Sequence, residues 1–233
     1  MKKQVSLVIF FISPLFLLAQ FGNVGGNTGV NMADYISYYD EANSNSPINL
    51  KSPEFYLFSS WENYGSVYVG KQVFRINNIN YDINMGQFLT KTDKDSLFIY
   101  NKHSIDSIEV NGRKFKKYYD SHSTDGKVVF AEVLFDSKDL NLVKGHYLSA
   151  IEASTNPMVN RPNNTIKQRT KYFITKNNTL IPFSLNKRNV LKQLKEKELQ
   201  EKAKDFANAN HLSFNSDKDV VAIFKNITNQ AKY

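Results

Sequence analysis

Residues 66–118 constrain the fold of this chain more than any other stretch. They read SVYVGKQVFRINNINYDINMGQFLTKTDKDSLFIYNKHSIDSIEVNGRKFKKY, a nearly continuous series of short apolar runs separated by turn residues. Apolar residues at every second position, with Gly, Asn and Asp between the runs, are typical of antiparallel strands joined by tight turns. The stretch therefore predicts an antiparallel β-meander, which the rest of the chain covers or extends.

The strongest turn signal in the meander is the dipeptide Asn111-Gly112. It separates two alternating runs, at 105–110 and 113–118. Asn and Gly tolerate the positive φ angles that both central positions of a type I′ turn require. The two runs are therefore predicted to form a β-hairpin.

A second local signal is an interruption of the alternation within residues 72–84. The step from Ile76 to Ile79 is odd, so the two side chains would point to opposite faces of a regular strand. A β-bulge or a strand break at Asn77-Asn78 would restore a single apolar face.

The periodicity changes near residue 186. Before that point, further strands are predicted at 127–135, 141–151, 170–175 and 179–185. Pro182 lacks a backbone N–H, which favours an edge position for the last of them. Beyond that point the apolar spacing becomes helical and predicts helices over 186–194 and 195–209, then a last helix that begins near Ser216. Strands followed by helices indicate an α+β fold: an antiparallel sheet of about eight or nine strands, curled or partly closed, with two or three C-terminal helices.

The first twenty residues have the composition of a secretory signal peptide. Lys2 and Lys3 precede an apolar run, and Ala19 offers a small residue for cleavage after it or after Gln20. No later apolar run approaches the length that spans a bilayer. We therefore expect export to the periplasm, the outer-membrane periphery or the cell exterior, with no transmembrane span after removal of the signal.

Four segments follow from these patterns. They are a signal peptide at 1–20, a flexible linker rich in Gly, Asn and Ser at 21–53, an antiparallel β domain at 54–185, and a C-terminal helical segment packed on it at 186–233. Within the linker, residues 33–39 are predicted as a short helix or a docking segment. The aromatic residues 54–61 are predicted as a first strand or an ordered entry into the sheet.

Composition excludes several kinds of chemistry. The chain has no Cys, which excludes disulfides, thiolate metal sites, a Cys nucleophile and a lipid-modified Cys. Its four His residues show none of the spacings of zinc sites, and no glycine-rich phosphate loop or GxSxG elbow is present. The net charge of +8 is interpreted as solvating surface charge, because no nucleic-acid-binding motif accompanies it. We therefore expect no cofactor, no metal and no nucleic-acid partner.

Four residues are weak candidates for a functional site. Asp120, His122 and Asp125 share one loop, and an imidazole between two carboxylates suits a metal or a general base. The same composition is typical of a solvated turn. Trp61, the only tryptophan, suits either a platform for a sugar ring or an aromatic side chain of the core or its rim.

Residues 215–219, NSDKD, resemble the opening of a calcium loop. However, the sixth and twelfth positions of such a loop want Gly and an acid, and here they are Val220 and Asn226. Ser216 as a helix N-cap, with Asp219 as its capping-box partner, is the better interpretation.

Several motifs together resemble a family of secreted proteins that is common in Bacteroidota. They are the leader ending Leu-Ala-Gln, the start GNVGG, the aromatic entry through Trp61, the block with Asn78, Asn80, Tyr81 and Asp82, and the tail NHLSFNSDKDVVAIFKNI. The resemblance covers residues 55–228. The family has no assigned activity, so the resemblance implies an envelope or secreted location and no particular substrate.

These observations favour a non-catalytic envelope module, binding or structural, whose ligand is left open and whose partner is an envelope component. One alternative is a secreted hydrolase that uses Asp or Glu, with or without His122, on a glycan or peptide. Another is peripheral association with anionic membrane through the basic helical residues 186–204. The oligomeric state and the strand order stay open.

Overall fold

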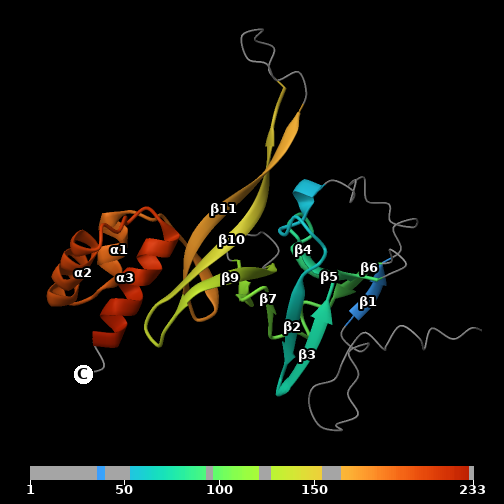
Figure 1. The fold of residues 1–233 in the computed structure, drawn as a ribbon, viewed down its shortest axis with the longest axis horizontal. Coiled ribbons are helices and arrows are strands. Elements are labelled where there is room, and N and C mark those ends of the chain that lie inside the picture. The colour runs from blue at the N-terminus through green and yellow to red at the C-terminus, as the bar shows by residue number, and fades with distance from the viewer. Residues whose placement is uncertain (1–35, 40–52, 93–96, 121–126, 154–163, 231–233) are drawn as a thin grey trace, which may run out of the picture.

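The computed structural model describes residues 36–39, 53–92, 97–120, 127–153 and 164–230. In these residues twelve strands form two antiparallel sheets, and three helices follow them in the chain (Figure 1). The predicted α+β class, with strands before helices, is confirmed.

The larger sheet has eight strands in the order β12-β11-β10-β9-β8-β7-β2-β3. Their bounds are β2 Tyr64–Val69, β3 Gln72–Asn77, β7 Ser107–Val110, β8 Arg113–Tyr119, β9 Val128–Asp136, β10 Asn141–Ile151, β11 Thr165–Lys176 and β12 Thr179–Phe183. The sheet curls until Thr179 of β12 meets Tyr119 of β8 in one parallel pair. The five strands β8 to β12 thereby form a partly closed, barrel-like ring, as the predicted curling required.

The smaller sheet has the order β1-β6-β5-β4, with β1 Ile36–Tyr39, β4 Ile79–Asp82, β5 Gln87–Lys91 and β6 Leu97–Tyr100. The chain enters it at the interrupted alternation: β3 ends at Asn77, and Asn78 has a φ of 55° before β4 begins. The predicted strand break is therefore confirmed. Its consequence is a second sheet, where the sequence had indicated a single one.

Two segments near the N-terminal end adopt one of their two predicted states. β1 lies inside the predicted linker and pairs with β6, so this patch is a docking strand and not a helix. Residues 54–61 form an ordered entry and not a strand. A short 3₁₀ helix η3 (Pro53–Phe55) leads to a single bridge between Tyr56 and Asp82.

Turn chemistry explains the hairpins. Asn111 and Gly112 have φ angles of 50° and 77°, as a type I′ turn requires. Asn177 and Asn178, with φ of 50° and 61°, connect β11 and β12 in the same region of backbone space.

The core has two main parts. One joins both sheets through buried side chains of the strands β2 to β9, among them Phe74, Phe88 and Phe115. The other lies under the helices α1 (Lys187–Gln193), α2 (Lys197–Ala209) and α3 (Asp217–Gln230), where Phe224 meets Phe135 of β9 at 5.5 Å between ring centroids. Figure 1 shows the helices gathered at the end of the molecule opposite the smaller sheet.

The start of α3 is only half of the predicted capping box. The Ser216 hydroxyl accepts from the Asp219 amide at 3.4 Å, as an N-cap should. The Asp219 carboxylate accepts from the Ser213 amide at 3.0 Å and not from that of Ser216. These residues therefore cap a helix and tie down the chain that precedes it.

The long hairpin of β10 and β11 extends beyond the rest of its sheet (Figure 1). Its pairing runs without interruption from Leu142↔Ile174 to Ile151↔Thr165. The upper part of β11 was missed in the sequence, because residues 165–170 are all exposed and show no alternation of apolar and polar side chains.

Candidate functional site

A large cleft lies where β9 and β10 separate. The two strands pair from Asn141↔Asp136 to Lys144↔Glu132, where their register ends. Beyond this point β9 continues against β8, and β10 continues against β11. A cleft of about 730 Å³ occupies the divergence. Its volume falls in the range of ligand sites in proteins, about 300–1,000 Å³.

Apolar side chains from β9, β11 and β12 form the walls of the cleft. They include Val129, Ala131, Phe173, Leu180, Pro182 and Phe183. Gly145 of β10 contributes bare backbone, and a Cβ built there would lie 3.0 Å from Cε2 of Phe173. The ring of Phe173 can approach the strand this closely only because position 145 has no side chain.

The rim of the cleft carries charge. Lys127 and Lys171 both line it and are exposed. The Lys171 ammonium lies 4.6 Å from the centroid of the Tyr147 ring, a cation–π contact. Asp120 is the one carboxylate among the described residues that line the cleft. An apolar interior with cations at its edge suits a ligand that has an anionic group.

Next to the cleft lies a buried ionic cluster centred on Glu132. Arg113 donates from Nε to Oε1 at 2.9 Å and from Nη2 to Oε2 at 2.6 Å. Nε2 of His146, a residue that also lines the cleft, lies 3.1 Å from Oε2. The Lys144 ammonium lies 3.8 Å from the same oxygen and 2.8 Å from Oδ2 of Asp217 at the start of α3. The cluster therefore links β8, β9, β10 and the helices.

The electrostatics of Glu132 indicate a structural role. Burial alone would raise the pKa of its carboxyl, but hydrogen bonds with His146 and Arg113 and the charges of Arg113 and Lys144 lower the pKa to about 2. Glu132 is therefore ionised at neutral pH and fully engaged, which is unsuitable for a general acid or a nucleophile. The Arg113 guanidinium also lies over the rings of Phe58 and Phe115, at 5.1 and 5.5 Å from their centroids.

The loop singled out in the sequence begins and ends at the cleft. Asp120, before the loop, and Lys127, after it, both line the cleft. His122 and Asp125 lie outside the described residues, so their contacts with Asp120 stay a prediction.

Trp61 lies elsewhere and does not line the cleft. Its half-buried ring meets Tyr56 edge-on at 5.0 Å, and the Lys91 ammonium is 6.0 Å from its centroid. It packs at the rim of the small cluster formed by Tyr56, Leu89 and Leu97. The signal-cleavage residues Ala19 and Gln20 lie outside the described residues.

Three residues of the site were missed in the sequence. Glu132 is a lone carboxylate inside the apolar strand KVVFAEVLF, a pattern that does signal a buried charge in need of partners. Lys127 and Lys171 have no such signal, because exposed lysines occur throughout the chain. Only the curled sheet brings these two residues to one rim.

The described residues contain no group of three His, Asp or Glu side chains that suits a metal ion. At the calcium-like stretch, Asp217 binds Lys144 and accepts from the Tyr172 hydroxyl at 3.3 Å. In the part of the chain that the structure describes, no helix combines the length and apolarity needed to cross a membrane.

Comparison of the chain with models of known protein families, with curated proteins and with solved structures gave no match. Its function is therefore inferred from the geometry of the cleft.

Proposed function

We propose that this protein is an exported, non-catalytic binding module of the periplasm, the outer-membrane periphery or the cell exterior, and that the cleft between β9 and β10 is its binding site. The observation that carries the proposal is the combination of about 730 Å³ of space, apolar walls, and Lys127 and Lys171 at the rim. The ligand has a body that packs against Phe173 and its neighbours and an anionic group that meets the two lysines.

The carboxylates argue for binding over catalysis. Hydrolysis of a glycosidic bond ordinarily uses two carboxyl groups on opposite sides of that bond. Among the described residues, Asp120 alone offers a carboxylate to the cleft, and Glu132 is occupied by Arg113, His146 and Lys144. The strongly lowered pKa of Glu132 is thus explained by its hydrogen bonds and by the charges around it.

The first test is fractionation of cells that produce the full chain, with the membrane pellet washed at low and then high salt. We expect recovery with the envelope and release by salt, because the rim lysines act through charge that salt screens. Gly145→Leu, which fills the cleft, and Lys127→Glu, an exposed change that spares the core, should both shift the protein to the soluble fraction.

Two controls accompany these variants. Lys138→Glu, in the turn between β9 and β10, and Lys176→Glu, on β11, each reverse an exposed charge that does not line the cleft. Both should fractionate like the unchanged protein. Recovery of the unchanged protein as a free soluble species would overturn the association with the envelope. Envelope binding that neither cleft variant alters would overturn the cleft as the binding site.

A hydrolase stays the second candidate, favoured by the position of Asp120 at the cleft and by the adjoining loop. It predicts turnover of a glycan or peptide that disappears in His122→Ala and Asp125→Ala while the fold is kept. Turnover that both variants leave unchanged would remove this candidate.

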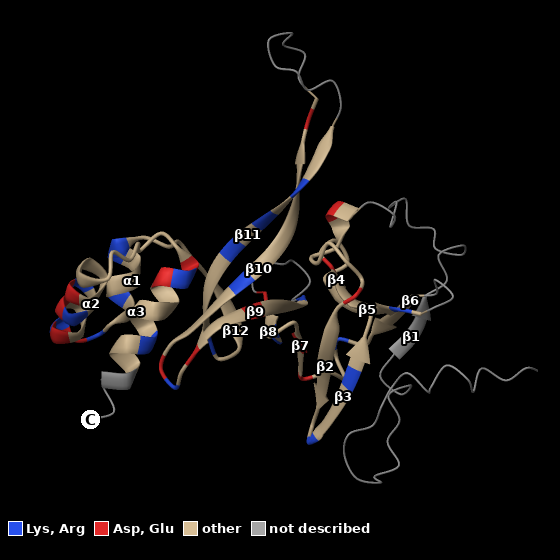
Figure 2. Ribbon diagram, viewed as in Figure 1, with Lys and Arg blue, Asp and Glu red and all other residues tan. Residues whose placement is uncertain are grey.

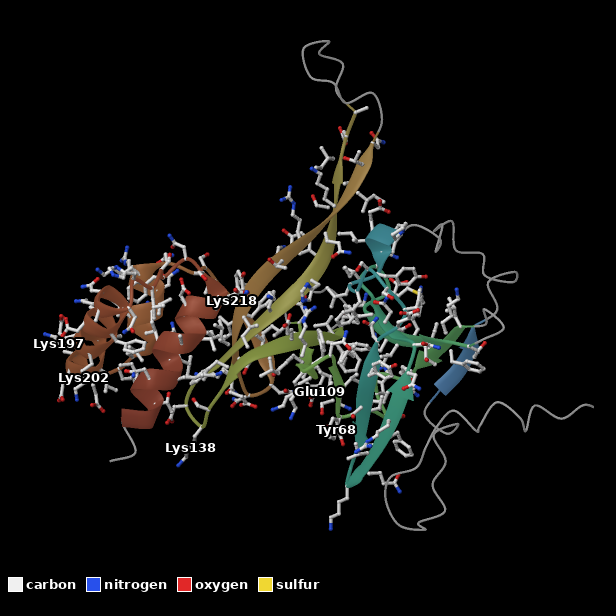
Figure 3. All side chains as sticks on the ribbon, viewed as in Figure 1. Tyr68, Glu109, Lys138, Lys197, Lys202 and Lys218 are labelled. Atoms are coloured by element: carbon white, nitrogen blue, oxygen red, sulfur yellow. The ribbon has the colours of Figure 1, made fainter. Side chains whose placement is uncertain are left out.

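The third alternative, membrane association through residues 186–204, stays a prediction. The apolar side chains of this segment are buried in the core, among them Val190, Leu191 and Ala203. The outer face has both signs of charge, with Lys202 paired to Glu198 and pointing outward from α2 together with Lys197 (Figure 3). Contact with anionic lipid would therefore rest on charge alone, and liposomes at low salt would test it.

A further inference from the structure

The β10–β11 ribbon presents a row of cations that leads out of the cleft. Lys171, Arg169 and Lys167 pair with Gly145, Tyr147 and Ser149. Alternate residues of a strand share a face, so the three cations lie on one face, together with Phe173 in the wall of the cleft. Along the strand they follow one another at intervals of about 7 Å.

The opposite face of the ribbon is occupied by the protein itself. Leu148 packs against the core that joins the two sheets. The Gln168 amide donates to the backbone oxygens of Glu54 and Tyr56, at 3.2 and 2.7 Å. The cation row is therefore on the face that is turned away from these contacts, and all three of its residues are exposed. Figure 2 shows basic positions along β11 where the ribbon leaves the sheet.

The charge of the row has no counterpart among the residues that the structure describes. The sequences of β10 and β11 contain no Asp or Glu. None of the three cations forms an ion pair with a described carboxylate, whereas Lys144, on the other face, has both Glu132 and Asp217. Among the described residues, the one printed contact of these charged groups is that of the Lys171 ammonium with the Tyr147 ring, which does not neutralise charge.

We propose that the row extends the cleft into a binding track for a linear acidic polysaccharide. This rests on the proposed function of the cleft, whose volume of about 730 Å³ takes the first three sugar units, the third of them beside Lys171 at the rim. The following acidic sugars then lie along Arg169 and Lys167, each carboxylate near a cation. An extended polymer with regularly spaced anions is complementary in charge to a row of regularly spaced cations.

A nucleic acid fits the row less well. Proteins that bind single strands combine cations with exposed aromatic rings on which bases stack. The aromatic residues of this face in the described part of the ribbon are Phe173 and Tyr147. Both line the cleft, and the Lys171 ammonium lies over the Tyr147 ring. The face thus offers charge and small polar side chains rather than stacking platforms.

The test compares the binding of long polygalacturonate, of trigalacturonate and of a neutral galactan to the full chain by calorimetry at about 50 mM salt. We expect the polymer to bind more tightly than the trimer. The neutral galactan should bind neither the cleft nor the row. The double variant Lys167→Glu/Arg169→Glu should weaken polymer binding by about tenfold or more, because two attractions become repulsions. Its binding of the trimer, which occupies only the cleft, should change by less than about twofold.

The matched control is Lys138→Glu/Lys176→Glu, which changes the net charge equally at two exposed positions away from the row. Lys138 lies at the turn between β9 and β10 (Figure 3). This control should bind the polymer as the unchanged protein does. Circular dichroism and the unfolding midpoint verify the fold of both double variants.

Several results would overturn the track. One is a trimer that binds as tightly as the polymer, and another is a control that weakens the polymer as much as the row variant does. A single-stranded oligonucleotide or anionic vesicles that bind more tightly than the polymer, and lose this in the row variant, would assign the row to that partner instead. Absence of binding by polymer and trimer, with envelope binding still lost in Gly145→Leu, would reject the polysaccharide and leave the cleft as the binding site.

Discussion

The two faces of the β10–β11 ribbon differ in whether their positive charges have carboxylate partners. On one face Lys144 joins a buried cluster in which Glu132 and Asp217 compensate its charge, and Nε2 of His146 lies 3.1 Å from the same Glu132 carboxylate. On the other face Lys167, Arg169 and Lys171 are exposed and have no described carboxylate beside them. The comparison teaches that charges of one sign, a few residues apart on the same hairpin, can serve the fold on one side and a partner on the other.

Removal of Glu132 should give the largest effect. Glu132→Ala leaves Arg113, Lys144 and His146 without their carboxylate in a mostly buried site, so we expect a loss of about 3–5 kcal/mol in the free energy of unfolding, measured in urea. The control is Glu152→Ala, an exposed residue just after β10. It should change the free energy of unfolding by less than about 0.5 kcal/mol. A loss below about 1 kcal/mol for Glu132→Ala would show that the cluster contributes little.

Lowering the pH should remove the stabilisation by this cluster without a mutation. The pKa of Glu132 is lowered from 4.5 to about 2 in the folded chain. The stabilisation is therefore fully present above the unfolded pKa and disappears as pH falls from about 4.5 towards 2. At about 1.4 kcal/mol per pKa unit the loss is about 3 kcal/mol. Stability curves against pH for the unchanged chain and Glu132→Gln should converge in this interval; parallel curves would contradict the assignment.

Arg113→Lys should have an intermediate effect. It keeps the charge but loses the two parallel hydrogen bonds to Glu132 and the contact of a planar guanidinium with Phe58 and Phe115. We expect a loss of about 1–2 kcal/mol in urea unfolding. Equal stability of the two chains would show that charge alone matters at this position.

The smallest effect on stability belongs to the exposed row. Lys167→Glu/Arg169→Glu should shift the free energy of unfolding by less than about 0.5 kcal/mol, because neither side chain is packed or paired in the described structure. A loss above about 1 kcal/mol would make the row part of the fold and remove the contrast between the two faces.

Local patterns were sufficient for most of the elements. Apolar runs bounded by turn residues located β8, β9 and β10 to within a residue or two, and Asn111-Gly112 identified its turn because few residues tolerate positive φ. The odd step from Ile76 to Ile79 revealed the end of β3. That it also marks a change of sheet could not be read, because strand pairing depends on residues distant in the chain.

The site was less accessible to prediction for the same reason. Its walls come from β9, β11 and β12, and its existence depends on the point at which β9 and β10 stop pairing. No local pattern encodes that point. The candidate loop was found because Asp120 belongs to a recognisable polar cluster, whereas the row on β11 resembled ordinary solvated lysines until its opposite face was seen to be occupied.

Few backbone contacts between β8 and β12 close the ring of strands. Thr179 pairs with Tyr119, and the Tyr119 amide donates to the backbone oxygen of Asn178 at 2.9 Å. A seam held by so few backbone contacts opens more readily than the ladders on either side of it. The amide of Tyr119 should therefore exchange with deuterium before that of Phe115 on the same strand. β12 and Asp120 also border the cleft. A ligand that contacts both would hold β8 and β12 together, and it should therefore slow the deuterium exchange of the Tyr119 amide.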